Sequence, residues 1–231
     1  MPCAFQLDDL RRRSPGCEFA VPDHELIPWE DKDWCQFHLP ITRKARWEEA
    51  RVDAFNVQLL DYIDRAKQAH EVADLSGVVF PGSITFERYA GEHNDLPKLM
   101  FLECTFGEAS FAGVRFSRGV DFQRATFSGD AGFQGVTFGG ETSFKSVIFS
   151  RNASFEGATF SHNACFDEAI FDEHASFSRS SFHGYVHLQH VKFNNEADFR
   201  TLRSARTSCL LGQSSNATLG STRPSSGTTL G

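Results

Sequence analysis

Four residues near the N-terminus have the types and the spacing of metal ligands. Cys35 and His38 are two residues apart, and Cys3 and Cys17 precede them in a Pro-rich segment. Together they could complete a closed tetrahedral zinc site, which would stabilise a segment too short to build its own core. Zinc ligands usually come as two close pairs, and only one is present here. Two interpretations stay open: a structural zinc site, or reduced thiols with His38 exposed.

Outside this segment, no catalytic motif accompanies the reactive side chains. His183, His187 and His190 follow one another closely, and Cys104 and Cys165 lie upstream of them. The sequence has no phosphate-binding glycine-rich loop, no nucleophile elbow and no HExxH pattern. No recognisable pattern places a base beside either thiol. We therefore expect no enzyme activity, no catalytic residues and no cofactor other than the structural zinc considered above.

Phenylalanine recurs along the chain with a short, regular period. The chain has 24 Phe but only three Trp and three Tyr. The spacing of the large apolar residues settles into an alternation of five and six, which fits neither a helix nor a long strand. Two positions before each of them except Phe101 stands a small or β-branched residue, which shares its face of an extended strand. The large residues are Phe101, Phe106, Phe111, Phe116, Phe122, Phe127, Phe133, Phe138, Phe144, Phe149, Phe155, Phe160, Phe166, Phe171, Phe177, Phe182, Leu188, Phe193 and Phe199.

Each unit has a small residue, a polar residue, a large central residue and two polar residues, as in Ala73-Asp74-Leu75-Ser76-Gly77. This pattern resembles that of the pentapeptide-repeat proteins. The resemblance implies an all-β repeat fold, a right-handed quadrilateral β-helix in which four units make one square turn. Because the units alternate between five and six residues, we expect about 22 residues per turn, with the extra residues at corners rich in Gly, Asn and Asp.

The repeat also places the reactive side chains. Cys104 falls on a small inward position and is expected to be an inert core residue. Cys165 directly precedes Phe166, so it points outward and is the most reactive thiol expected within the repeat. The three histidines named above fall beside central residues or at a corner. They are expected to point outward in different directions and to be exposed.

The pattern divides the chain into four segments. Residues 1–42 form an irregular Cys- and His-containing segment, and residues 43–72 show the spacing of an amphipathic helix. We expect this helix to cap the open N-terminal end of the β-helix, which covers residues 73–199. Within it, residues 87–100 break the repeat and form either a loop inserted at a corner or an irregular half coil, of which we favour the loop. Residues 200–231 are rich in Ser, Thr and Gly and are expected to be disordered.

No segment of the sequence is suited to cap the C-terminal end of the β-helix. Two explanations are kept: the last coil pairs with a second copy to form a homodimer, or the chain is truncated or frameshifted relative to its relatives. No stretch approaches the length of a membrane-spanning helix, and the N-terminus lacks the apolar run of a signal peptide. We therefore expect a soluble, cytoplasmic protein without a membrane partner.

The charge of the chain limits its partners. The formal net charge is −7, which argues against direct binding to nucleic acid. We expect a non-enzymatic, rigid scaffold for protein interactions, whose partner the sequence does not identify. The resemblance implies an alternative, a DNA mimic that binds a type II topoisomerase, although residues 101–199 carry only 12 acidic against 7 basic residues. A second alternative is a metal-binding regulatory module built on the N-terminal Cys and His residues.

One column of outward residues stands out on the expected surface. Stacking every 22 residues brings Thr105, Thr126, Ile148, Ile170 and Lys192 into one line. Isolated apolar residues on a sheet face are explained by β-propensity alone. Two adjacent isoleucines on a flat, polar surface are typical of a contact site. We therefore predict that Ile148 and Ile170 mark the interaction face.

Overall fold

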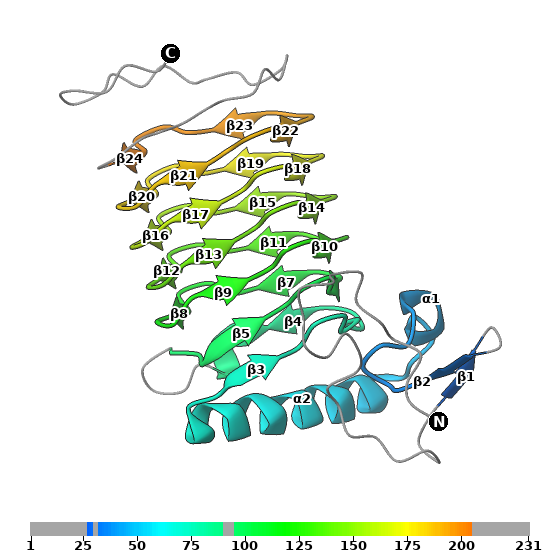
Figure 1. Cartoon of the computed structure of the whole chain (residues 1–231). Coiled ribbons are helices and arrows are strands. Elements are labelled where there is room, and N and C mark those ends of the chain that lie inside the picture. Colours follow the sequence, from blue (N-terminus) through cyan, green and yellow to red (C-terminus); the bar gives the residue numbers. More distant parts are fainter. Residues whose placement is uncertain (1–26, 30–31, 90–94, 205–231) are drawn as a thin grey trace.

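The chain winds into a four-sided β-solenoid, which Figure 1 shows from the side as a stack of coils. This computed structural model describes residues 27–29, 32–89 and 95–204. Each side of the solenoid is a parallel sheet in which strands pair with those one turn earlier and one turn later. The strands of the coils are only two or three residues long, because the chain turns a corner after each repeat unit. The quadrilateral β-helix expected from the sequence is confirmed.

The first two sides are named face 1 and face 2, in the order in which the chain visits them. Face 1 contains β3 (Val72–Asp74), β5 (Lys98–Met100), β9 (Val120–Asp121), β13 (Thr142–Ser143), β17 (Ala164–Cys165) and β21 (Val186–His187). Face 2 contains β6 (Thr105–Phe106), β10 (Thr126–Phe127), β14 (Ile148–Phe149), β18 (Ile170–Phe171) and β22 (Lys192–Phe193).

Face 3 and face 4 complete each turn. Face 3 contains β4 (Ile84–Thr85), β7 (Ala109–Ser110), β11 (Ala131–Gly132), β15 (Ala153–Ser154), β19 (Ala175–Ser176) and β23 (Ala197–Asp198). Face 4 contains β8 (Arg115–Phe116), β12 (Thr137–Phe138), β16 (Thr159–Phe160), β20 (Ser181–Phe182) and β24 (Arg203–Ser204). The pairing of β24 with β20 extends the coil beyond Phe199, where the repeat pattern ends. The expected disordered tail lies, from residue 205 onward, outside the described residues.

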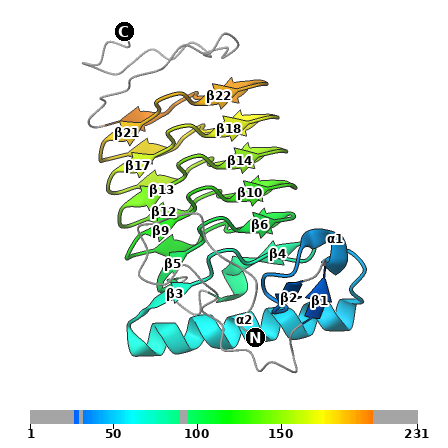
Figure 2. The same cartoon turned by 45° about the vertical axis from the view of Figure 1, so that its right-hand side comes forward.

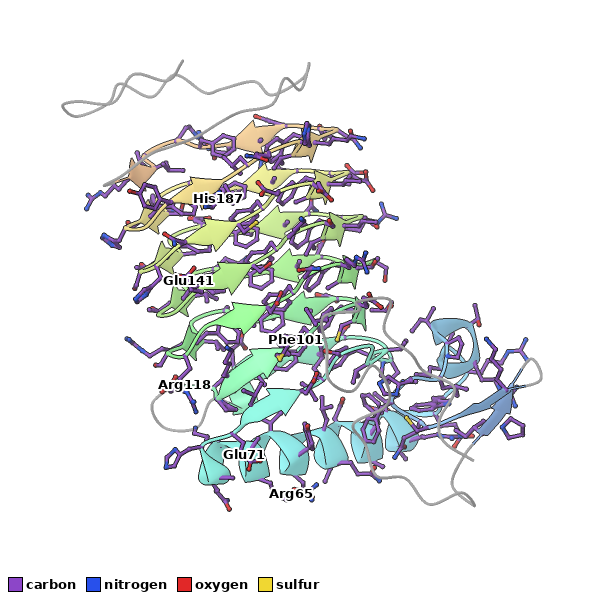
Figure 3. The ribbon with its side chains drawn as sticks, in the orientation of Figure 1. Arg65, Glu71, Phe101, Arg118, Glu141 and His187 are labelled. Carbon is purple, nitrogen blue, oxygen red and sulfur yellow. The ribbon has the colours of Figure 1, made fainter. Side chains whose placement is uncertain are left out.

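Stacked phenylalanine rings fill the inside of the solenoid. The ring of Phe155 lies between those of Phe133 and Phe177, with centroids 4.8 and 4.9 Å away and planes nearly parallel. Neighbouring columns meet edge to face, as Phe144 and Phe155 do at 5.3 Å. Both arrangements are favourable for aromatic pairs. Figure 3 shows these rings between the sheets, with Phe101 in one of the lower coils. The inward assignment of the Phe residues is therefore confirmed.

A helix covers the N-terminal end of the solenoid. α2 (Glu49–Ala69) lies across the end below β3 in Figure 1, and its apolar face buries Phe55, Leu59 and Ile63. It is shorter than the expected 43–72, because Glu48 is extended and His70 ends the helix in a left-handed conformation. Before it come β1 (Ile27–Trp29), β2 (Lys32–Trp34) and the short helix α1 (Ile41–Lys44). No helix in the described part of the chain has both the length and the apolar character to cross a membrane.

The break in the repeat before Phe101 is shorter than expected. A 3-10 helix (Phe86–Tyr89) leaves the first coil after face 3, and the chain has rejoined the coil at Asp95, which bridges to Arg115 on face 4. Leu96 and Leu99 are buried inside the coil. The prediction of a loop over 87–100 was therefore wrong for residues 95–100. Leucines replace the usual residues there, so the Phe pattern did not reveal these positions.

Candidate interaction surface

The outward positions of face 2 form the column expected from the sequence. Thr126 pairs with Thr105 and with Ile148, and Ile170 pairs with Ile148 and with Lys192. Ile148 is 36% exposed, although the neighbouring Phe149 is fully buried. Figure 2 shows this sheet as an open column of strands above α1. The register of the column is confirmed, and its role as a contact face stays a prediction.

Face 3 and face 4 present flat, polar surfaces without an apolar patch. The outward positions of face 3 are mostly Ser and Gly, as at Ser110, Gly132 and Ser154. On face 4 the strands carry Thr137 and Thr159 at the paired outward positions, with Arg and Ser in the same column. Apart from the arginines of face 4, these side chains are small and polar, are well solvated and offer no apolar anchor for a partner.

Face 1 is hollowed along its middle. An open hollow of about 410 Å³ lies there, and Asp121, Ser143, Cys165 and His187 are among its lining residues. Figure 3 shows Glu141 and His187 along this side of the solenoid. The pKa of the Cys165 thiol is raised above its ordinary value, mainly by burial. The thiol is therefore protonated at neutral pH and is a weak nucleophile. The hollow therefore has the groups of a polar surface rather than those of an activated catalytic site.

The other candidate residues of the repeat lie where the sequence placed them. Cys104 is fully buried, and burial raises the pKa of its thiol well above the ordinary value. His183, His187 and His190 are exposed on a corner, on face 1 and on the next corner. These three histidines do not converge, so the structure gives them no shared site.

Charged residues pair between neighbouring coils at the corners. Arg124 lies 3.0 Å from Glu103 in the coil before it, and Arg179 pairs with Glu156 in the same way. Both pairs are solvent-exposed, so each stabilises the fold by less than about 1 kcal/mol. At these two corners an acid of one coil therefore lies beside a base of a neighbouring coil.

The structure brings together two of the four expected zinc ligands. Cys35 and His38 are buried, with Cys35 Sγ 3.1 Å from His38 Nδ1. His38 Nε2 donates to the carbonyl oxygen of Ser76 at 3.0 Å, so in a neutral ring Nδ1, which faces the thiol, is the acceptor. The expectation that His38 is exposed in the absence of zinc is wrong. Its ring is buried because it fastens the N-terminal segment to the first coil.

The remaining two candidate ligands, Cys3 and Cys17, lie outside the described residues. Within the described ranges, no group of three or more His, Cys, Asp or Glu side chains is arranged to hold a metal. The pair is oriented as ligands would be, since a metal-bound histidine usually donates its other ring N–H to a carbonyl. The zinc site stays a prediction, which elemental analysis of the protein and of Cys35→Ser would test.

A buried lysine, which the sequence analysis missed, joins the N-terminal segment to the coil. Lys44 Nζ donates to the carbonyl oxygen of Phe37 at 2.9 Å and to that of Val79, and it lies 4.6 Å from the centre of the Phe55 ring. Burial lowers the pKa of Lys44 well below its ordinary value. Its neighbours in the sequence include three arginines, and no signal distinguishes Lys44 from them. Only the tertiary packing identifies it.

Comparison with known proteins supports the repeat assignment. The family model for pentapeptide repeats (9 copies) matches residues 122–164 and 155–201. No curated protein and no solved structure matches the chain. The matched residues include the strands of face 2 from β14 to β22.

Proposed function

Because this chain is a pentapeptide-repeat protein with one continuous aromatic core, we propose that it acts as a protein-interaction scaffold that contacts its partner through face 2. Phe side chains occupy the interior along the described coils, so the groups that can meet a partner are on the outer surface. Function then depends on which outward side chains favour contact with a partner over contact with water.

The proposal rests on the apolar pair in the middle of face 2. Ile148 and Ile170 are adjacent on paired strands, and polar Thr126 and the cation Lys192 lie on either side of them along the column. A small apolar centre with a polar surround is the usual organisation of a protein-binding site. Short strands joined by backbone hydrogen bonds hold the two side chains in fixed positions, which reduces the entropy lost on binding.

A scaffold is favoured over a DNA mimic by the distribution of charge. A mimic of duplex DNA needs a continuous acidic face, because a topoisomerase binds the phosphate backbone through cationic side chains. The outward columns of the described coils carry Asp, Met, Ser, Cys and His on face 1, mainly Thr and Ile on face 2, mainly Ser on face 3, and Thr with Arg and Ser on face 4, so none of them is continuously acidic. Three acids, Glu103, Glu156 and Glu168, also pair with bases of neighbouring coils.

The proposal is tested by replacing the apolar pair. The double variant Ile148→Asp, Ile170→Asp should keep its circular dichroism spectrum, since both side chains point outward, but should lose the proteins that the wild type captures from its host. The matched control is Thr137→Asp, Thr159→Asp, which introduces the same charges at paired positions of face 4. Loss of captured proteins in the control, or their retention in the face 2 variant, would show that the contact lies elsewhere.

A further inference from the structure

The charges around the two isoleucines are segregated by coil. The strand β14 lies within residues 145–151, KSVIFSR, which carry two cations and no acid. The next strand of face 2, β18, lies within residues 167–173, DEAIFDE, which carry four acids and no cation. Each strand has one isoleucine at its outward position, with charges at the corners on both sides. Face 2 is therefore basic on one side of its centre and acidic on the other.

From this pattern we infer that face 2 binds a second copy of the same chain. The inference rests on the proposed function, because it names the partner of that face. A two-fold axis along the strand direction, midway between β14 and β18, would set β14 of each copy against β18 of the other. Ile148 would then face the partner's Ile170, and the contact would be the same in both directions, as a two-fold interface requires.

The charges match in this arrangement and clash in the alternative one. With the axis along the strands, Lys145 faces the acids at Asp167 and Glu168 of the partner subunit, and Arg151 faces Glu173 of the partner subunit. With the axis along the solenoid, each coil would face its own copy, so that Lys145 would oppose the partner's Arg151. Opposite charges across a contact favour one docking mode, and like charges exclude the other. The sequence of face 2 therefore selects the antiparallel pairing of two solenoids.

Stacking of coils within one chain uses only part of this charge. Lys145 Nζ lies 3.8 Å from Glu168, and the two side chains are 42% and 54% exposed. Asp172 and Glu173 accept hydrogen bonds from the neutral amides of Asn194 and Asn195 in the next coil. No ion pair within the described coils neutralises these two acids, and they stay available to a cation of a second copy.

The outer levels of the face agree with this docking. One coil further from the two-fold axis on each side, β10 would face the partner's β22. Thr126 would then meet the partner's Lys192, and the column of outward residues that contains the isoleucines would bring no like charges together. Figure 2 shows α1 beside β6 and the β1–β2 hairpin below that strand. Face 2 of a second copy would not reach as far as β6, because β22 is its last described strand. Among the described residues, α1 and the β1–β2 hairpin therefore leave the strands from β10 to β22 open.

A charge-swap experiment tests this inference. Face 2 is narrow, so the contact is small and we expect a weak monomer–dimer equilibrium of the wild type, measured by analytical ultracentrifugation over a wide concentration range. In Lys145→Glu, Arg151→Glu both coils of the contact become acidic, and in Glu168→Lys, Glu173→Lys the cations Lys145 and Arg151 of each copy face lysines of the other. Each variant alone should dimerise at least about tenfold more weakly than the wild type. An equimolar mixture of the two should regain the wild-type affinity, because each copy then offers the other an opposite charge.

Three results would overturn the inference: a wild type that is monomeric throughout, swapped variants that dimerise like the wild type, or a mixture no tighter than its components. Circular dichroism of each variant controls for folding. A wild type that is monomeric but loses host proteins in Ile148→Asp, Ile170→Asp would refute the second copy and leave the contact face of the proposed function in place. Dimers that persist in that double variant would place self-association on another surface.

Discussion

Left-handed backbone at the corners determines which single residues the fold tolerates. At the corner between faces 3 and 4 three of the five left-handed positions are glycines, Gly113, Gly135 and Gly157, and the last two are Arg179 and Thr201. Between faces 1 and 2 most of them are side-chain-bearing residues such as Arg124 and Ser146. A left-handed conformation is unfavourable for residues with a Cβ and favourable for glycine. The second corner is therefore the more strained of the two.

This difference predicts opposite effects of exchanging the residue types. An added Cβ at Gly135 would meet nothing within 4 Å, so Gly135→Ala should lower the free energy of unfolding by about 1 kcal/mol through backbone conformation alone. Ser146→Gly should leave stability unchanged or raise it by up to about 1 kcal/mol, since φ there is 55°. Urea unfolding of both variants measures these changes. A neutral Gly135→Ala would contradict the strain argument.

Lys44 predicts a dependence of stability on pH. Because burial holds the pKa of Lys44 below its ordinary value of 10.5, the unfolded chain binds a proton there over a pH range in which the folded chain does not. The free energy of unfolding should therefore rise with pH over that range and level off near 10.5. Lys44→Met should remove this slope, and Lys98→Met, at an exposed lysine, should keep it. Urea titrations at increasing pH measure this slope for each variant. An unchanged slope in Lys44→Met would show that Lys44 is not the group responsible.

At the scale of elements, the sequence predicted the coils well and their attachments less well. Every unit repeats the same inward pair, so Phe155 and Ala153 could be placed from spacing alone. Positions filled by leucine, such as Leu96, escaped detection because they break the phenylalanine pattern. The limits of α2 depend on the extended backbone at Glu48 and the left-handed one at His70, which spacing does not specify. The N-terminal attachment depends on buried contacts between residues far apart in sequence.

The stacking of coils predicts which neighbouring positions within one coil tolerate substitution. Phe155 has ring contacts with the coils before and after it, so Phe155→Ala should lower the free energy of unfolding by about 3–5 kcal/mol. Glu156 is its neighbour in the chain but points outward to the exposed Arg179, so Glu156→Ala should cost less than about 0.5 kcal/mol. Melting curves of the two variants measure this difference. Equal shifts would contradict the inward and outward assignment.

For the whole molecule, the solenoid separates stability from recognition. Inward columns of phenylalanine hold the coils together, and the outward columns can change without disturbing them, because each coil contacts mainly its neighbours. The four faces have thereby acquired different surfaces on one core. Face 1 is hollowed and polar, face 3 is small and polar, face 4 is rich in threonine, and face 2 carries the apolar pair between cationic and anionic coils. The position of the isoleucine column followed from the repeat period, whereas the hollow on face 1 is visible only in the structure.

The most direct test of face 2 as the contact surface is crosslinking at single sites in the host cell. A photoreactive side chain replaces Thr126 on face 2 in one variant and Thr159 on face 4 in another, both at half-buried outward positions. The proposed contact predicts that the Thr126 variant forms a crosslinked species, at twice the mass of the chain if the partner is a second copy, and that the Thr159 variant forms none. A crosslink from Thr159 alone, or equal yields from both positions, would contradict it.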